Sequence, residues 1–229
     1  MTGPHTVLDA NTYWEQHYGE EFRFGQGTEH ILAMLRRLPP AASWADLGSG
    51  SESLLWATAL HVGRLTAVDT DPRRLAILTD FAAAARPRPA HRTALALSRR
   101  TEPDAFTARC RWLTAAVTAD CLTGRPLSHP ALGQGFDLVT QFGLLGLTRG
   151  PEHFVRCFSA AHQLLAPGGW AAGANWEAAD LTGRVRLTSA LFQHAAEHSG
   201  LTLTTVRRIP SADLQFPAVW LYTGRITHP

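Results

Sequence analysis

The stretch that decides the fold is residues 43–51, which read Ser-Trp-Ala-Asp-Leu-Gly-Ser-Gly-Ser. A short apolar run ends in two glycines, and a helical pattern follows over about residues 52–60, so the stretch predicts a strand, a tight turn and a helix. Glycines in such a turn let a ligand lie against bare backbone. Ser53 stands where a dinucleotide fingerprint has its third glycine, which argues against a pyrophosphate-binding NAD enzyme.

Around this stretch, short apolar runs alternate with longer helical patterns, which is typical of an α/β domain with a mostly parallel sheet. We predict strands over residues 43–47, 64–68, 113–118, 136–140, 170–174, 201–206 and 218–225. We predict helices within 8–38 (with Thr28 as a cap), 52–60, 72–84, 86–112, 152–165 and 188–199, and a turn at Pro167-Gly168-Gly169. The expected organisation is one domain over residues 1–229, with an amino-terminal helical cap or lid over 1–40 and a Rossmann-like core over 41–229.

Three acids stand at the ends of three successive predicted strands, opposite the glycine turn. Asp46 comes just before the turn, where it can accept hydrogen bonds from loop amides and lie near a cationic ligand. Asp69, at the end of the second strand, can accept both hydroxyls of a ribose. Asp120 follows the third strand and is placed to meet an adenine amino group. Each acid alone is more often a helix cap or turn residue, but together they indicate a phosphate-free, positively charged nucleoside, S-adenosylmethionine.

The chain resembles the class I S-adenosylmethionine-dependent methyltransferases over nearly its whole length. The resemblance rests on five motifs in the family's order: ADLGSGS (45–51), AVDTDPRRL (67–75), TADCL (118–122), FDLVTQFG (136–143) and LLAPGGW (164–170). It implies a Rossmann-like fold, a mostly parallel seven-stranded sheet with helices on both faces, and S-adenosylmethionine as the donor, with S-adenosylhomocysteine as its product.

A narrower resemblance begins at residues 11–18, Asn-Thr-Tyr-Trp-Glu-Gln-His-Tyr, followed by Phe24-Gly25. It is similar to the nicotinamide, phenylethanolamine and indolethylamine N-methyltransferases. This resemblance implies that Tyr13, facing the reacting methyl group, and Tyr18, at the carboxylate end of the methionine, line a lid over the donor. The other donor-binding residues that it implies are Gly48, Ser49, Gly50, Asp69, Thr70, Asp120, Cys121 and Phe142, with Arg74 standing where the family has asparagine.

The acceptor side departs from that family, because Asn175-Trp176-Glu177 follows the fifth strand without the family's pair of tyrosines. We expect Trp14, Asn175 and Trp176 to contact the acceptor, although core packing is the alternative for the tryptophans. A protonated amine needs a base before it attacks. Glu177 is the leading candidate for that base, followed by His17; a neutral heteroaromatic nitrogen or a thiolate needs none.

The composition limits which binding partners and which cellular location we expect for this protein. The chain has 229 residues and a net charge of +2, and its 21 basic residues are all arginine, in scattered pairs, so we expect no nucleic-acid partner. It has no apolar run of about 18 residues and therefore no expected membrane span. Three widely spaced cysteines, Cys110, Cys121 and Cys157, predict reduced thiols in a cytoplasmic protein with no metal site.

The predicted function is methyl transfer to a small-molecule metabolite, most of all to an amine or heteroaromatic nitrogen, by a monomer or homodimer. Transfer to oxygen or sulfur of an aromatic molecule is the same-fold alternative. A nucleic-acid methyltransferase is disfavoured, because Gln141-Phe142-Gly143-Leu144 stands where such enzymes carry an Asn/Asp-Pro-Pro-Tyr/Phe box. A non-catalytic S-adenosylmethionine-binding protein stays open, since binding and transfer use the same loop.

Overall fold

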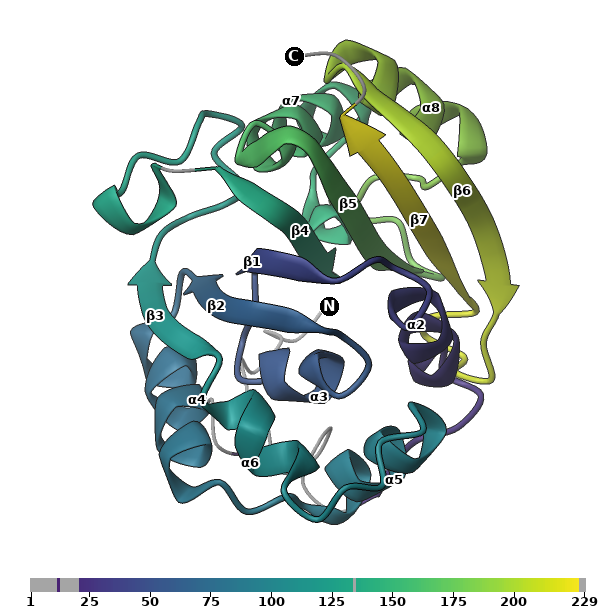
Figure 1. The fold of residues 1–229 in the computed structure, drawn as a ribbon. Coiled ribbons are helices and arrows are strands. Elements are labelled where there is room, and N and C mark those ends of the chain that lie inside the picture. Colours follow the sequence, from purple (N-terminus) through teal and green to yellow (C-terminus); the bar gives the residue numbers. More distant parts are fainter. Residues whose placement is uncertain (1–11, 13–20, 134, 227–229) are drawn as a thin grey trace.

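The computed structural model describes residue 12 and residues 21–133 and 135–226, and the strands form one seven-stranded sheet (Figure 1). In the order β3-β2-β1-β4-β5-β7-β6, the strands are β3 Leu113–Thr118, β2 Val62–Asp69, β1 Ala41–Leu47, β4 Phe136–Phe142, β5 Leu165–Glu177, β7 Ala218–Ile226 and β6 Leu201–Pro210. Strand β7 runs antiparallel to both of its neighbours, and the other pairs are parallel. This confirms the predicted Rossmann-like sheet.

Helices cover both faces of the sheet (Figure 1). The group near β1 and β2 comprises α2 Thr28–Leu35, α3 Ser53–Ala57, α4 Pro72–Ala84, α5 Pro89–Leu97 and α6 Ala105–Cys110. The group near β5, β7 and β6 comprises α7 Pro151–His162 and α8 Ser189–His198. Short 3-10 turns are η2 Pro130–Leu132 and η3 Leu145–Leu147. The region 86–112, predicted to be helical, contains α5 and α6.

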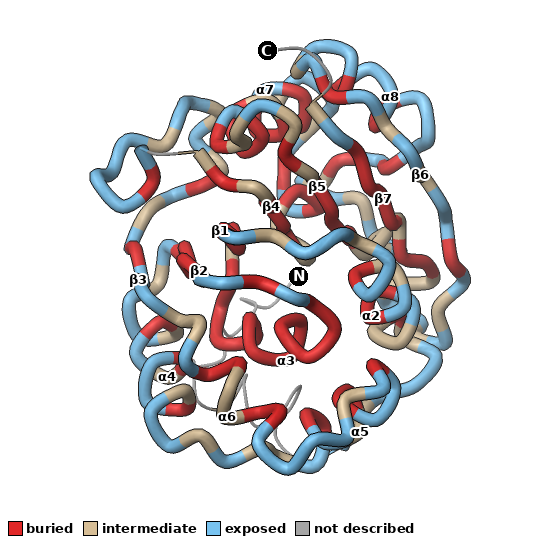
Figure 2. The backbone as a smooth tube through the Cα atoms, viewed as in Figure 1, coloured by how far each residue is buried: buried red, intermediate tan, exposed pale blue. Residues whose placement is uncertain are grey.

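The central strands contain runs of consecutive buried residues, coloured red in Figure 2, such as residues 43–47 of β1 and 65–69 of β2, so both faces of these strands are covered there. Along β1 the side chains alternate, so that Trp44 packs into the core beneath α2 and α3, while Ala45 and Leu47 pack into a core on the opposite face. The Trp44 Nε1–H group donates to Thr140 Oγ1 at 2.7 Å, which satisfies the indole inside the sheet. Strand β1 is therefore a rigid support for the turn that follows it.

The described part of the predicted cap differs from a long helix. Helix α2 begins at Thr28, and its N-cap is Gly27 rather than Thr28, with no side-chain cap. Gly25 and Gly27 have φ values of +76° and +97°, a conformation that interrupts a helix. Ile31, Leu32 and Leu35 of α2 are buried in the main core. The division into a cap over 1–40 and a core stays a prediction, because residues 1–11 and 13–20 lie outside the described ranges.

Two further local predictions need correction. The segment Pro167-Gly168-Gly169, predicted to be a turn, lies within β5, where the pairing with β4 shifts register between Phe136 and Leu138. The helix predicted over residues 52–60 is shorter and ends at Ala57.

The three cysteines are free and buried. No helix among the described residues is long and apolar enough to cross a membrane.

Candidate active site

The turn after β1 is shaped by its glycines. Gly48 and Gly50 have φ values of +63° and +54°, where a residue with a Cβ is strained. A Cβ on Gly48 would also lie 2.8 Å from Leu144 Cδ1, so a side chain there would push into the loop after β4. The Ser49 amide donates to the Val68 carbonyl at 2.9 Å and ties the turn to β2. The turn is therefore held open beside the end of β2.

Asp69, the last residue of β2, joins that turn to the start of α4. Its Oδ2 accepts the Gly50 amide at 2.8 Å, and its Oδ1 accepts the Asp71 amide at 2.8 Å. The residue is only 6% exposed, so these two bonds orient a buried carboxylate. Each carboxylate oxygen still has a free lone pair. Asp69 can thus accept two further hydrogen bonds, as a ribose would require.

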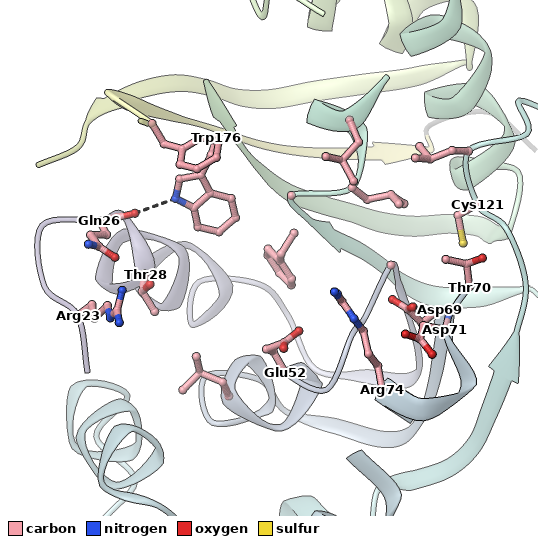
Figure 3. A pocket seen from close by; sticks show the side chains of 18 of the residues that line it. Arg23, Gln26, Thr28, Glu52, Asp69, Thr70, Asp71, Arg74, Cys121 and Trp176 are labelled. Atoms are coloured by element: carbon pink, nitrogen blue, oxygen red, sulfur yellow. Dashed lines mark hydrogen bonds between the residues drawn. The ribbon is translucent and has the colours of Figure 1, made fainter. Parts of the chain in front are cut away.

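A cavity of about 720 Å³ lies at the carboxyl ends of the central strands (Figure 3). The strand order reverses beside β1, which is where open α/β sheets bind ligands, and the volume suits a small molecule. The predicted residues that line it are Gly48, Asp69, Thr70, Arg74, Asp120, Cys121, Phe142 and Trp176. Eight predicted positions from five separate stretches of the chain are therefore brought to one site.

The cavity has an excess of negative charge among its described lining residues. Six carboxylates line it, from Glu21, Glu52, Asp69, Asp71, Asp120 and Asp213. Three guanidinium groups line it, from Arg23, Arg74 and Arg184. This excess attracts a ligand with positive charge.

Another part of the cavity is lined by residues 119–122, which follow β3. The Asp120 Oδ1 atom accepts the Leu122 amide at 2.8 Å, which orders the turn that carries Cys121. Burial raises the pKa of the Cys121 thiol to about 12. The thiol is therefore neutral and offers an apolar contact rather than a nucleophile.

Contrary to the prediction from sequence, Asp46 contacts neither the loop amides nor the cavity but lies beneath the glycine turn. Its carboxylate accepts hydrogen bonds from the Ser53 hydroxyl at 2.6 Å and the Thr140 hydroxyl at 2.7 Å, not from loop amides. It does not line the cavity, and burial raises its pKa to about 7. Asp46 therefore joins β1, β4 and α3 beneath the turn. Ser49 and Gly50 likewise shape the turn without lining the cavity.

The far end of the cavity is formed around Trp176, near the end of β5. Its Nε1–H group donates to the Gln26 carbonyl at 3.0 Å, as Figure 3 shows. This bond joins β5 to the segment before α2 and holds the indole in place. Phe142 lies at the end of β4, with its ring centroid 4.5 Å from that of Trp56. Aromatic side chains therefore line this end of the cavity.

Asn175 and Glu177 do not reach the cavity, because successive side chains of a strand point to opposite faces. The buried Asn175 accepts the Gly146 amide at 2.9 Å through Oδ1. The Glu177 carboxylate accepts Arg208 Nε at 2.8 Å, Arg208 Nη2 at 3.0 Å and Trp220 Nε1 at 2.8 Å. The hydrogen bonds from Arg208 lower the pKa of Glu177. The prediction of Glu177 as a base and of Asn175 as an acceptor contact is therefore not supported by their positions.

Sequence reasoning missed several lining residues. Glu52 directly follows the glycine turn, and that proximity was a usable signal. Arg184 and Phe216 come from two loops, after β5 and between β6 and β7, which meet through the Ala179 amide and the Gln215 carbonyl at 2.9 Å. The Arg184 guanidinium carbon lies 5.9 Å from the Phe216 ring centroid. No local pattern marks those two loops as neighbours.

Four predicted residues, Tyr13, Trp14, His17 and Tyr18, lie outside the described ranges. Within residues 21–133 and 135–226, no three histidine, cysteine or acidic side chains gather as a metal site would require.

Solved structures with a similar fold include several methyltransferases. The N-methyltransferase NodS from Bradyrhizobium japonicum, in complex with S-adenosylhomocysteine, is 16% identical, with a TM-score of 0.59 over 86% of this chain and 84% of that one. A putative sarcosine dimethylglycine methyltransferase from Galdieria sulphuraria is 12% identical, with a TM-score of 0.61 over 96% and 99%. The chain has the methyltransferase fold. A putative methyltransferase from Bacillus halodurans is similar too, at 12% identity and a TM-score of 0.55 over 87% and 99%. No family model and no curated protein matches this chain.

Proposed function

We propose that this chain is an S-adenosylmethionine-dependent methyltransferase that acts on a small-molecule acceptor. The observation that carries the proposal is Asp69, a buried carboxylate fixed by the Gly50 and Asp71 amides at the switch point of the sheet. A carboxylate held in this way suits the two hydroxyls of a ribose. The excess of carboxylates over guanidinium groups in the cavity suits a donor with a sulfonium group.

The lining residues assign the parts of the donor to parts of the cavity. Asp69 would hold the ribose, while Thr70, Asp120 and Cys121 would surround the adenine. Gly48 leaves room for the donor beside the turn, and Phe142 lies toward the sulfur. S-adenosylmethionine supplies a methyl group on a sulfonium, which is electrophilic without help from the protein. The work of the protein is then to align the acceptor and exclude water, which contributes about 7–11 kcal/mol in well-aligned reactions.

We propose a nitrogen acceptor, an amine or a heteroaromatic nitrogen. Phe142, Trp176 and Phe216 line the acceptor end, and aromatic faces attract a methylated ammonium by about 0.5–2 kcal/mol each. NodS is named an N-methyltransferase, and the Galdieria protein is named a putative sarcosine dimethylglycine methyltransferase, whose named compounds are amines. In this proposal Tyr13 and Tyr18 close over the donor, Trp14 contacts the acceptor and His17 serves as the base. These four roles follow the likeness to the nicotinamide, phenylethanolamine and indolethylamine N-methyltransferases.

The test has two stages. Calorimetry with S-adenosylhomocysteine measures donor-site binding, and we expect one site per chain. Incubation with methyl-labelled S-adenosylmethionine and a panel of amines, phenols, thiols and RNA then identifies the acceptor. Label in amines supports the proposal, whereas label confined to phenols or thiols, or to RNA, overturns the nitrogen or the small-molecule assignment. Tight binding without transfer to any of them would indicate a binding protein, and an absence of binding would refute the function as a whole.

A further inference from the structure

Beyond its share of the negative charge of the cavity, Glu52 has no individual role in the function proposed above, although it is an acid buried in that cavity. It is the N-cap residue of α3, two positions after Gly50, and its side chain makes no capping hydrogen bond. Glu52 is only 8% exposed, and it lines the cavity. Figure 3 shows it between Asp69, toward one end of the site, and Trp176 at the other. A buried acid therefore stands in the middle of the proposed donor site.

The Glu52 carboxylate packs directly over Gly50 of the glycine turn. The Glu52 Oε2 atom occupies the space that a Cβ on Gly50 would take, so glycine at position 50 leaves room for the carboxylate. The other oxygen, Oε1, accepts the Ser51 hydroxyl at 3.0 Å. The Ser51 backbone amide also donates to this carboxylate, and among the described residues no further hydrogen bond to it is seen, so the carboxylate can still accept one from a ligand in the cavity.

The charged groups around Glu52 do not offset the cost of burying its carboxylate. Arg74 from α4 attracts its negative charge and Asp69 from β2 repels it. Burial outweighs the attraction and raises the pKa of Glu52 to about 7. A buried carboxylate of this kind gains a large part of its missing solvation when a cationic group binds beside it. The ligand group that suits Oε2 is therefore a positively charged hydrogen-bond donor.

The orientation of S-adenosylmethionine in the cavity identifies the cationic group that would reach Glu52. This step rests on the proposed function. With the ribose at Asp69 and the base toward Cys121, the amino-acid part of the donor must extend the other way, past Glu52. That part carries a carboxylate, which Glu52 repels, and an α-ammonium group, which it attracts. We propose that Glu52 binds the α-ammonium group of the donor.

The test compares three ligands that share the nucleoside and differ at the amino-acid end. These are S-adenosylhomocysteine, its analogue with hydrogen in place of the α-amino group, and 5′-methylthioadenosine. Glu52→Gln is expected to weaken binding of S-adenosylhomocysteine by about 10- to 100-fold, the size of a lost charge-assisted hydrogen bond. Binding of the other two ligands is expected to change by less than about 2-fold. The matched control is Glu152→Gln, an exposed acid in the first turn of α7 that does not line the cavity, which should leave all three affinities unchanged.

The outcomes separate this inference from the function on which it rests. If the unchanged protein binds none of the three nucleosides, the proposed function fails. If it binds all three and Glu52→Gln weakens them equally, or weakens none, the role of Glu52 is overturned while the function stands.

Proton release by the unchanged protein supplies a test that needs no variant. At pH 7, binding of S-adenosylhomocysteine should release about half a proton, because a carboxyl with a pKa of about 7 is half protonated at that pH and the ammonium favours its ionised form. The analogue without the amino group should release none. Equal release by both ligands would overturn the assignment, and calorimetry in buffers of different ionisation enthalpy measures it.

Discussion

The two ends of the cavity are assembled differently. At the donor end, Asp69 contacts Gly50 and Asp71, which lie 19 and 2 positions away in the sequence. At the acceptor end, Trp176 is held by Gln26, 150 positions away. The first end is made by turns that follow neighbouring strands, and the second by segments that meet only in the folded protein. The donor end is thus specified locally, whereas the acceptor end depends on long-range packing.

The largest expected effect concerns the donor end. Asp69→Ala removes the carboxylate that would accept two ribose hydroxyls, and it leaves the Gly50 amide without its acceptor. Donor affinity should fall by at least about 3 kcal/mol, or more than 100-fold. Calorimetry with S-adenosylhomocysteine measures this loss. Asp80→Ala, at an exposed position of α4, is the control and should bind normally. Equal affinity of both variants would remove Asp69 from the site.

The second effect is a pH dependence of stability that arises in the donor end. The pKa of Glu52 is raised from 4.5 to about 7, so the folded protein holds this proton better than the unfolded chain. Its stabilising contribution is therefore complete below pH 4.5 and is lost as the pH rises through 7. Glu52→Gln should then raise the free energy of unfolding of the ligand-free protein by about 2–3 kcal/mol at pH 8, and by almost nothing at pH 4.

Urea denaturation at the two pH values measures this difference. Glu177, which lies outside the cavity, provides the contrast, because its pKa is lowered by the hydrogen bonds from Arg208 and its stabilising contribution is instead lost as the pH falls. A gain in stability of the same size at pH 4 and pH 8 would mean that Glu52 acts through packing and not through its charge.

The third prediction separates the two ends. Trp176→Ala should lower kcat/KM for the acceptor by about 2- to 30-fold, the size of one aromatic contact with a cation. Donor affinity should stay within about 2-fold. Trp170→Ala is the matched control, since Trp170 lies on the same face of β5 but outside this cavity. If Trp176→Ala lost donor affinity and acceptor turnover to the same extent, the two ends would not be separate.

The smallest effect is expected at Glu177. Glu177→Gln weakens its ion pair with the exposed Arg208, which should cost about 1 kcal/mol of stability or less. Turnover should remain within about 2-fold, because the carboxylate lies outside the cavity. Steady-state kinetics and thermal melting check both points. A tenfold loss of turnover with an unchanged melting temperature would return Glu177 to the role of base.

Site residues could be predicted from the sequence best where the local backbone conformation alone determines the residue type. The glycines at 48 and 50 and the acid at 69 could be placed because a turn with positive φ and a strand end are local features. Prediction was weaker for Asp46, because its two hydroxyl partners could be known only after α3 and β4 had been positioned. Prediction failed for Asn175 and Glu177, because the alternation of side chains along β5 turns these two residues away from the face on which Trp176 lines the cavity.

The sequence by itself determined the strand–turn–helix unit, the order of the motifs and the acids at the strand ends, because backbone conformation and hydrophobic periodicity act over a few residues. Only the tertiary structure decided which side chain of β5 enters the cavity, which distant loops supply Arg184 and Phe216, and that Glu52 lies over Gly50. Those outcomes depend on strand register and on packing between segments far apart in the chain, and neither is written in a local pattern.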